Sequence, residues 1–322
     1  MPTIVAWVRR VPGRFGRVVD ALRVMQPFES LPAVPDDLDV EVWDGVGALP
    51  SDDALERIGF YVMPYTFAPM TAEVIRRLPN VSAVQTLTAG YEHVVPYLPD
   101  GVTLCNARGV HDSSTAELAV TLTLASLRGV PGFVRQQDRG DWAPGWFESL
   151  ADKTVLVVGY GSIGQAIESR LLPFECDVLR VARTAREGVA GFESLPQLLG
   201  RADVVILIVP LTEQTQGMVD ASFLAAMRDG ALLVNVARGP VVDTDALVAE
   251  LATGRLRAAM DVTDPEPLPP THPLWTSPNV LISPHVGGTT TAFLPRAQRL
   301  VRSQLERFAA GEPLANVVVA GS

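Results

Sequence analysis

Three side chains suited to acid–base chemistry and anion binding follow separate apolar segments in the C-terminal half of the chain. They are Arg238, Glu266 and His285. A guanidinium forms two matched hydrogen bonds with a carboxylate, and an imidazole exchanges protons near neutral pH. Taken singly, each residue has an ordinary explanation as a surface charge, a loop residue or a structural histidine. Their shared position after an apolar segment indicates one site.

Six apolar segments of strand length after Lys153 are the elements that must position these side chains. Nearly continuous apolar runs are typical of strands buried on both faces, hence of a parallel sheet with crossover helices. Ligands of such sheets bind beyond the carboxyl ends of the strands, so we expect the three side chains at one rim. The segments are 154–158, 177–181, 203–209, 231–236, 258–262 and 280–283.

A glycine-rich loop, GYGSIG over 159–164, joins the first of these segments to a helical run. This context is the one that a dinucleotide-binding loop requires. Gly159 permits a tight turn, Gly161 lets the backbone approach a pyrophosphate, and Gly164 allows close helix–strand packing. Ser162 and Ile163 open the helix, whose N-terminal amides would hold the phosphates. The alternative is a purely structural turn.

The end of the second segment indicates which dinucleotide is bound. Sites for NAD carry an acidic residue about 20 positions after the glycine loop, and Ala182 stands there instead. Arg183 and Thr184 are suited to a 2′-phosphate, with Arg186 as a helper. We therefore expect NADP(H), with NAD(H) as the alternative cofactor; two ordinary surface arginines are the structural explanation.

Composition limits the remaining classes. The 322 residues suggest about two domains. A net charge of −10 argues against a nucleic-acid or polybasic membrane surface, and no apolar run reaches the ~20 residues of a membrane span. Two cysteines, Cys105 and Cys176, make neither a disulfide framework nor a four-thiolate zinc site. The charged N-terminus does not resemble a signal peptide, so we expect a cytoplasmic protein. We also expect no metal site.

The N-terminal hundred residues predict a small α/β unit. Strands are expected over 4–8, 40–43 and 59–63, and a helix over 71–78.

A long apolar helix is expected from residue 111 to about 128, with Ser114 and Glu117 at capping-box spacing. It is either sandwiched between domains or subunits, or the core helix of one domain. An exposed loop over 140–145 follows it, and a last helix over 289–310 returns to the first domain.

Further motifs accompany the glycine loop: VPLTEQTQG (209–217), NVARG (235–239), MDVTDPEPL (260–268), SPHVGG (283–288), TAGYEHV (88–94), and Asn106 with Glu117. Together they resemble the D-isomer-specific 2-hydroxyacid dehydrogenase family over the whole chain. The resemblance implies a Rossmann-type doubly wound sheet of residues 104–286. It is inserted into a smaller flavodoxin-like α/β substrate domain formed by 1–103 and 287–322. Homodimers are usual in the family, with the crossing helix and its following loop in the interface.

The resemblance also implies residue roles. Arg238 would bind the carboxylate and keto oxygen of the substrate, and His285 would protonate the carbonyl oxygen as hydride arrives. Glu266 would pair with His285 and favour its imidazolium form. Asp261 would orient the nicotinamide carboxamide. Further cofactor positions are Pro210, Ala237 and Gly287, further substrate positions are Ala89, Gly90 and Tyr65, and His93, His111 and His272 are expected to be structural or surface residues.

These roles predict an NADPH-dependent reductase of small 2-keto acids to D-2-hydroxy acids, of the glyoxylate or hydroxypyruvate type. One alternative is a dinucleotide-sensing protein like the corepressors of this family, and another is a relative that oxidises phosphite. Formate is disfavoured because formate dehydrogenases of the family carry Gln where this chain has Glu266. Tyr65 either contacts substrate or simply packs.

Two departures from the family pattern stand out. The usual G-x-D-x-x-D of the substrate loop is replaced by GYEHVV over 90–95, so side-chain contacts there are expected to differ. With no residues after 322 for a C-terminal regulatory domain, we expect no serine feedback.

Overall fold

The computed structural model describes residues 23–28, 38–66 and 70–321, and the expected strand over 4–8 lies outside them. The chain divides into one unit of Met1–His111 with Thr291–Ser322 and another of Asp112–Thr290. Both divisions come later than the expected ones, after 103 and 286. The first boundary lies after His111 because of packing, since Ala107 and Val110 are buried in the core of the first unit. The ring of His111 also lies 2.7 Å from the Leu87 carbonyl oxygen of that unit.

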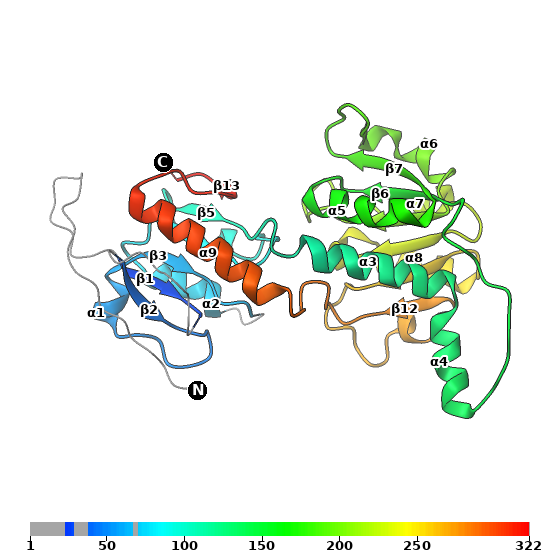
Figure 1. The fold of residues 1–322 in the computed structure, drawn as a ribbon, viewed down its shortest axis with the longest axis horizontal. Helices are drawn as coiled ribbons and strands as arrows, with labels where there is room; N and C mark the ends of the chain where they lie inside the picture. Colours follow the sequence, from blue (N-terminus) through cyan, green and yellow to red (C-terminus); the bar gives the residue numbers. More distant parts are fainter. Residues whose placement is uncertain (1–22, 29–37, 67–69, 322) are drawn as a thin grey trace. The chain divides into compact units, whose positions relative to one another are not determined.

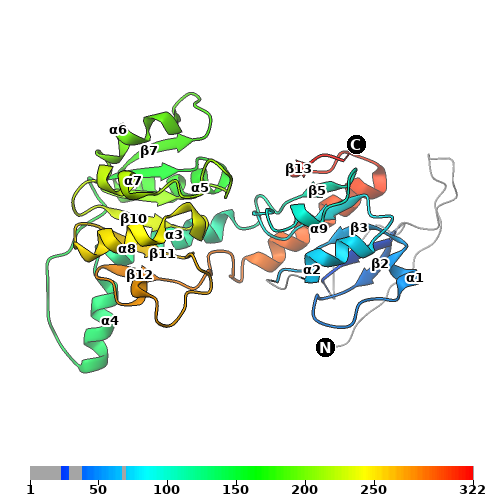
Figure 2. The same cartoon turned by 180° about the vertical axis from the view of Figure 1, so that it is seen from behind.

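The first unit contains a six-stranded sheet in the order β13-β5-β4-β3-β1-β2 (Figures 1 and 2). All neighbours are parallel except β13, which pairs antiparallel with β5. The parallel strands thus follow the flavodoxin-like order 2-1-3-4-5, which confirms the expected architecture. The strands are β1 (Arg23–Gln26), β2 (Asp39–Val42), β3 (Ile58–Val62), β4 (Ala83–Gln85), β5 (Thr103–Cys105) and β13 (Val317–Val319).

Two helical layers cover this sheet because adjacent strand residues face opposite sides. Phe60 of β3 packs in the cluster that includes α9 (Phe293–Ala310), and its neighbour Tyr61 packs with α1 (Asp52–Leu55) and the α2 (Met70–Glu73) region. The helix expected over 71–78 is split in two, because α2 ends at Glu73 and a 3₁₀ turn, η1 (Val74–Arg77), continues it. The C-terminal helix returns to this unit as predicted: Gln304 donates to the Gln85 side chain at 2.7 Å.

The second unit contains a seven-stranded, wholly parallel sheet in the order β12-β11-β10-β9-β6-β7-β8 (Figure 1). Each of the six predicted segments overlaps one strand, which confirms the Rossmann-type order. The sequence analysis missed only the two-residue β8, which is too short to give a periodic signal. The strands are β6 (Thr154–Val158), β7 (Asp177–Ala182), β8 (Ala190–Gly191), β9 (Val204–Leu207), β10 (Leu232–Asn235), β11 (Arg257–Met260) and β12 (Val280–Ile282).

Helices cover both faces of the second sheet. On one face α3 (Asp112–Leu127) packs against α5 (Ser162–Leu171) and strands β10 and β11. This packing supports the interpretation of α3 as a core helix. The other face carries α6 (Leu195–Leu199), α7 (Ala221–Ala226) and α8 (Thr244–Ala252). The remaining short turns are η2 (Val95–Tyr97), η3 (Leu172–Phe174), η4 (Phe192–Ser194), η5 (Gly239–Val241) and η6 (Pro273–Trp275).

The expected capping box at Ser114 is wrong. Helix α3 already begins at Asp112, so Ser114 lies inside it, and its hydroxyl is 2.7 Å from the Thr290 hydroxyl. A tertiary partner has replaced the local one.

After α3 the chain turns into α4 (Val130–Arg139) and then the exposed loop that was predicted, where Trp142 is 97% exposed. In the described part of the chain, no single helix is long and apolar enough to cross a membrane; only α3 and α4, bent by 64°, pass that test as a pair.

Candidate active site

Three neighbouring parallel strands, β10, β11 and β12, bring the predicted side chains to one rim of the second sheet. Arg238 follows β10, Glu266 follows β11 and His285 follows β12. A Cβ on Gly239 would lie 1.9 Å from the Thr263 carbonyl oxygen. Only glycine therefore lets the Arg238 segment lie directly against the loop that carries Glu266.

His285 and Glu266 form a direct pair. His285 Nδ1 lies 2.5 Å from Glu266 Oε1, and the side chains are 32% and 38% exposed. His285 has φ of 53°, in the left-handed region that a histidine rarely adopts. Such a conformation persists only where the surroundings hold it. The pair predicted from sequence is therefore present, on a fixed backbone that leaves the imidazole partly open to solvent.

Hydrogen bonds to Asp261 fix the backbone of the His285 segment. Its carboxylate is 3% exposed and accepts from Ser283 Oγ at 2.6 Å and from the amides of Val286 and Gly287, each at 2.9 Å. The His285 amide donates to the Asp261 carbonyl oxygen at 2.7 Å. Sequence analysis assigned Asp261 only to the nicotinamide. It missed this set of hydrogen bonds from Ser283, Val286 and Gly287 to the carboxylate, which we call the Asp261 bracket. A hydroxyl two residues before the histidine was the available signal.

Arg238 is half-buried, and its Nη1 donates to the Ala237 carbonyl oxygen at 2.7 Å. The buried Asn235, which sequence analysis did not single out, fixes this turn. Its amide nitrogen donates to the Arg238 carbonyl oxygen at 3.1 Å, and its Oδ1 accepts from the Ala237 amide at 3.0 Å. The signal was a polar residue ending a strand that is buried throughout.

The glycine loop joins β6 to α5 in the geometry that the sequence predicts. Gly159 has φ of 109°, and a Cβ there would lie 2.4 Å from the Ile208 carbonyl oxygen. A Cβ on Gly164 would lie 2.4 Å from the Gly159 carbonyl oxygen. By contrast, a Cβ on Gly161 would meet no described atom within 4 Å, so space is open above the start of α5. This cradle fits a pyrophosphate, with Ser162 and Ile163 in the first turn of the helix.

The segment after β7 carries exposed cations beside the loop. Arg183 lines an open pocket of about 470 Å³ with Thr212, Glu213 and Gln214. Arg186 Nη2 donates to the Tyr160 carbonyl oxygen at 2.5 Å. Thr184 is exposed and Ala182 is the last residue of β7, so the strand ends without a carboxylate. These residues fit a phosphorylated ribose.

Three other expected cofactor residues lie in loops that internal hydrogen bonds fix. The Pro210 carbonyl oxygen accepts from Thr215 Oγ1 at 2.6 Å, Ala237 is held by Asn235, and Gly287 by Asp261.

The expected substrate residues Ala89, Gly90 and Tyr65 lie in the first unit. Asn106 Nδ2 donates to the Ala89 carbonyl oxygen at 2.8 Å, and Thr88 Oγ1 donates to that of Gly90 at 2.6 Å. Among the described residues, the Ala89 and Gly90 amides have no hydrogen-bond acceptor. The loop is thus anchored through its carbonyl groups.

The Tyr65 ring packs against other aromatic rings, and its contact with substrate stays a prediction. Its ring centroid lies 4.3 Å from that of Phe293 and 5.5 Å from that of His111. His111 is buried and His272 accepts from the Leu274 amide at 3.2 Å, so both have structural roles as predicted. His93 is exposed.

Comparison with known proteins identifies the family. The sequence model described as D-isomer specific 2-hydroxyacid dehydrogenase, NAD binding domain, matches residues 120–287. The chain belongs to this family. The human glyoxylate reductase/hydroxypyruvate reductase is 33% identical over 308 aligned positions, and the match covers 86% of this chain and 90% of that protein.

Two crystal structures of this family agree with the fold. A D-isomer specific 2-hydroxyacid dehydrogenase from Xanthobacter autotrophicus Py2, in complex with NADPH and MES, is 31% identical with a TM-score of 0.78, covering 93% of this chain and 98% of that one. The NADPH-dependent glyoxylate/hydroxypyruvate reductase from Sinorhizobium meliloti, in complex with NADP and sulfate, is 27% identical with a TM-score of 0.78, covering 92% and 98%. The chain is therefore an NAD(P)-dependent 2-hydroxyacid dehydrogenase, an oxidoreductase that acts on CH–OH donors.

Proposed function

We propose that this dehydrogenase reduces small 2-keto acids of the glyoxylate or hydroxypyruvate type to D-2-hydroxy acids, with NADPH as the preferred reductant. The His285–Glu266 pair, 2.5 Å apart beside the Arg238 segment, is the observation that carries this proposal. A proton donor next to a carboxylate-binding guanidinium is what reduction of a 2-keto acid needs. The Asp261 bracket supports it, because it holds His285 in a fixed conformation.

The reaction follows from these groups. NADPH, when bound, supplies a hydride to the carbonyl carbon, while Asp261 orients its carboxamide. Arg238 holds the carboxylate and the keto oxygen, so the negative charge that develops on that oxygen faces a cation. His285 donates its Nε2 proton to the oxygen, which completes the hydroxyl group. Glu266, hydrogen-bonded at Nδ1, orients the ring so that Nε2 faces the substrate oxygen.

The segment after β7 supports the preference for NADPH. Arg183 and Thr184 would hold the 2′-phosphate, with Arg186 beside them, and Ala182 offers no carboxylate to bind a free ribose hydroxyl. Both family structures described above contain NADPH or NADP. In this proposal the Ala89 and Gly90 amides also bind the substrate carboxylate, and Tyr65 contacts the rest of the substrate.

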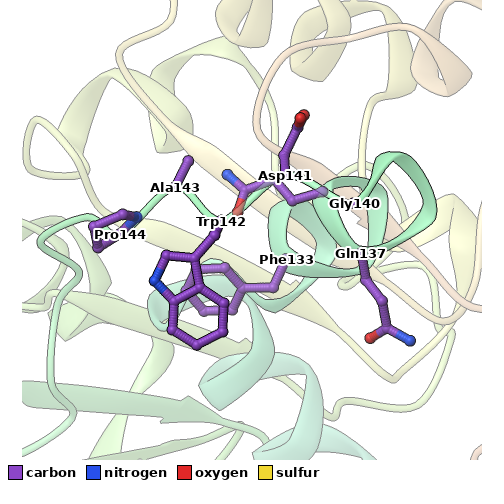
Figure 3. Close-up of a pocket in the computed structure, with 8 residues that line it drawn as sticks. Phe133, Gln137, Gly140, Asp141, Trp142, Ala143 and Pro144 are labelled. Carbon is purple, nitrogen blue, oxygen red and sulfur yellow. The ribbon is translucent and has the colours of Figure 1, made fainter.

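We also propose a homodimer that uses α4 and the segment after it. Trp142 and Trp146 are fully exposed, and Phe133 and Trp142 help to line an open pocket of about 520 Å³ (Figure 3). Exposed aromatic patches of this kind mark association surfaces. The double variant Trp142→Ser/Trp146→Ser should shift the sedimentation coefficient of the protein to that of a monomer. A wild-type protein that sediments as a monomer at micromolar concentration would contradict the dimer.

The proposed reaction is tested by following oxidation of NADPH and of NADH at the reduced-nicotinamide absorbance band. Substrates should run from glyoxylate and hydroxypyruvate to phenylpyruvate. We expect fast turnover of a small substrate with NADPH preferred. Arg183→Ala should raise the KM for NADPH by about tenfold, since it removes a charge-assisted hydrogen bond, and should leave NADH nearly unchanged. Tight NADPH binding without turnover of any keto acid would overturn the proposal in favour of a sensing role.

A further inference from the structure

A buried carboxylate binds the tyrosine of the glycine loop and takes no part in the proposed chemistry. Glu168 of α5 is 6% exposed. It accepts a hydrogen bond from Arg180 Nε of β7 at 2.7 Å and another from the Tyr160 hydroxyl. Arg180 holds the pKa of Glu168 below its usual value, so the carboxylate stays ionised at neutral pH. A buried charge with two hydrogen-bonded partners is a rigid anchor, because loss of Arg180 would leave the carboxylate uncompensated and loss of the Tyr160 hydroxyl would remove one of its donors.

This anchor fixes the side chain of Tyr160, the second residue of the glycine loop. The hydroxyl end of Tyr160 is bound to Glu168, and the Arg180 guanidinium carbon lies 5.8 Å from the ring centroid. Burial, followed by the neighbouring Glu168, raises the pKa of the hydroxyl, which therefore remains a donor. The Tyr160 ring is thus held by Arg180 over the ring and by Glu168 at the hydroxyl.

The fixed ring in turn holds Arg186. The guanidinium carbon of Arg186 lies 5.7 Å from the Tyr160 ring centroid, within cation–π range, and Nη2 donates to the Tyr160 carbonyl oxygen. The Arg186 backbone is fixed as well, because it exchanges two hydrogen bonds with Val189, at 2.9 and 2.8 Å. An exposed arginine otherwise samples many rotamers and loses that freedom when it binds a phosphate.

We infer that Tyr160, anchored by Glu168 and Arg180, is a positioning residue that pre-orders Arg186 and thereby raises selectivity for nucleotides with a 2′-phosphate. The inference rests on the proposed function, in which the segment after β7 receives that phosphate. In this inference Arg186 is already held against Tyr160 of the glycine loop before the nucleotide arrives. Tyr160 then affects binding of the 2′-phosphate only. A purely structural Tyr160 would affect all adenine nucleotides alike.

The test measures binding of adenosine 2′,5′-bisphosphate and adenosine 5′-monophosphate by calorimetry, which needs no turnover. The ratio of their Kd values reports selectivity. Tyr160→Leu removes the ring, and we expect the ratio to fall about three- to fivefold, the size of an exposed cation–π contact. Tyr160→Phe keeps the ring and loses the bond to Glu168, so its fall should be about twofold or less. In an Arg186→Ala background, Tyr160→Leu should change the ratio no further.

The outcomes separate this inference from the proposed function. If the wild-type protein binds both nucleotides equally, the NADPH preference fails and the inference falls with it. If the wild-type protein prefers the bisphosphate and Tyr160→Leu lowers affinity for both nucleotides equally, the inference alone is overturned. Should Tyr160→Leu fail to fold, Tyr160→Phe with and without Arg186→Ala decides: an effect of Tyr160→Phe on the ratio that persists without Arg186 contradicts the inference.

Discussion

Two glycines of the same loop allow packing and cofactor binding to be measured separately. Gly161→Ala and Gly164→Ala each add one methyl group, three residues apart in the sequence. The new Cβ at position 164 would lie 2.4 Å from the Gly159 carbonyl oxygen, about 1 Å short of an ordinary contact of 3.4 Å. At position 161 it would meet no described atom within 4 Å. Position 161 is also unstrained for alanine, with φ of −91°.

These distances give opposite expectations. Overpacking by one methyl group costs about 1–3 kcal/mol. A backbone clash belongs at the upper end of that range, and the gain in helix propensity from Gly to Ala returns about 1 kcal/mol. The net cost of Gly164→Ala is therefore about 2 kcal/mol, or about 4–8 °C in Tm for a unit of this size. Gly161→Ala should leave Tm within about 2 °C.

For cofactor binding we expect the opposite order, with the larger effect in Gly161→Ala. A methyl group at position 161 occupies the space proposed for the pyrophosphate, so the Kd values of NADPH and NADH should both rise about 10- to 100-fold, the loss of one or two hydrogen bonds to a charged group. Tm from calorimetry and Kd from quenching of protein fluorescence measure the two quantities. An unchanged Kd in Gly161→Ala would refute the pyrophosphate cradle, and an unchanged Tm in Gly164→Ala would refute the tight contact.

Three further predictions test the rim and the buried anchor. His285→Gln should lower kcat about 10²- to 10⁴-fold in the NADPH assay with little change in Kd for NADPH, because it removes the proton donor and not the glycine loop. Asp261→Asn should destabilise the protein by about 2–4 kcal/mol in urea unfolding, against about 1 kcal/mol for Ser283→Ala, since the new amide nitrogen opposes a buried amide donor at Gly287; equal losses would contradict the bracket. Arg180 lowers the pKa of Glu168 in the folded state. The Glu168 carboxylate therefore stabilises the fold fully above the ordinary glutamate pKa of 4.5, and this stabilisation is lost as pH falls below that value. The stability difference from Glu168→Gln should therefore shrink between pH 5 and pH 3.

Much of the second unit is predictable because its signals are local. Apolar runs predict strands buried on both faces, and a parallel sheet then requires their carboxyl ends to share a rim. That single rule brought Arg238, Glu266 and His285 together from segments nearly fifty residues apart. The glycine loop was equally accessible, because the contacts that require Gly159 and Gly164 are made within the β6–α5 unit and its neighbouring strand. The cytoplasmic location stays a prediction.

What could not be predicted depends on partners that are distant in sequence. Ser114 has the spacing of a local cap, yet its hydroxyl meets Thr290, 176 residues away. Asp261 was assigned to the cofactor alone, because nothing in the sequence shows that its carboxylate would collect donors from the loop after a neighbouring strand. A pattern identifies the groups that react, whereas the groups that hold them are chosen by tertiary geometry. This difference is why Asn235, Ser283 and Tyr160 became evident only in the structure, and why substitutions at such positions are the most direct tests of how the site is held.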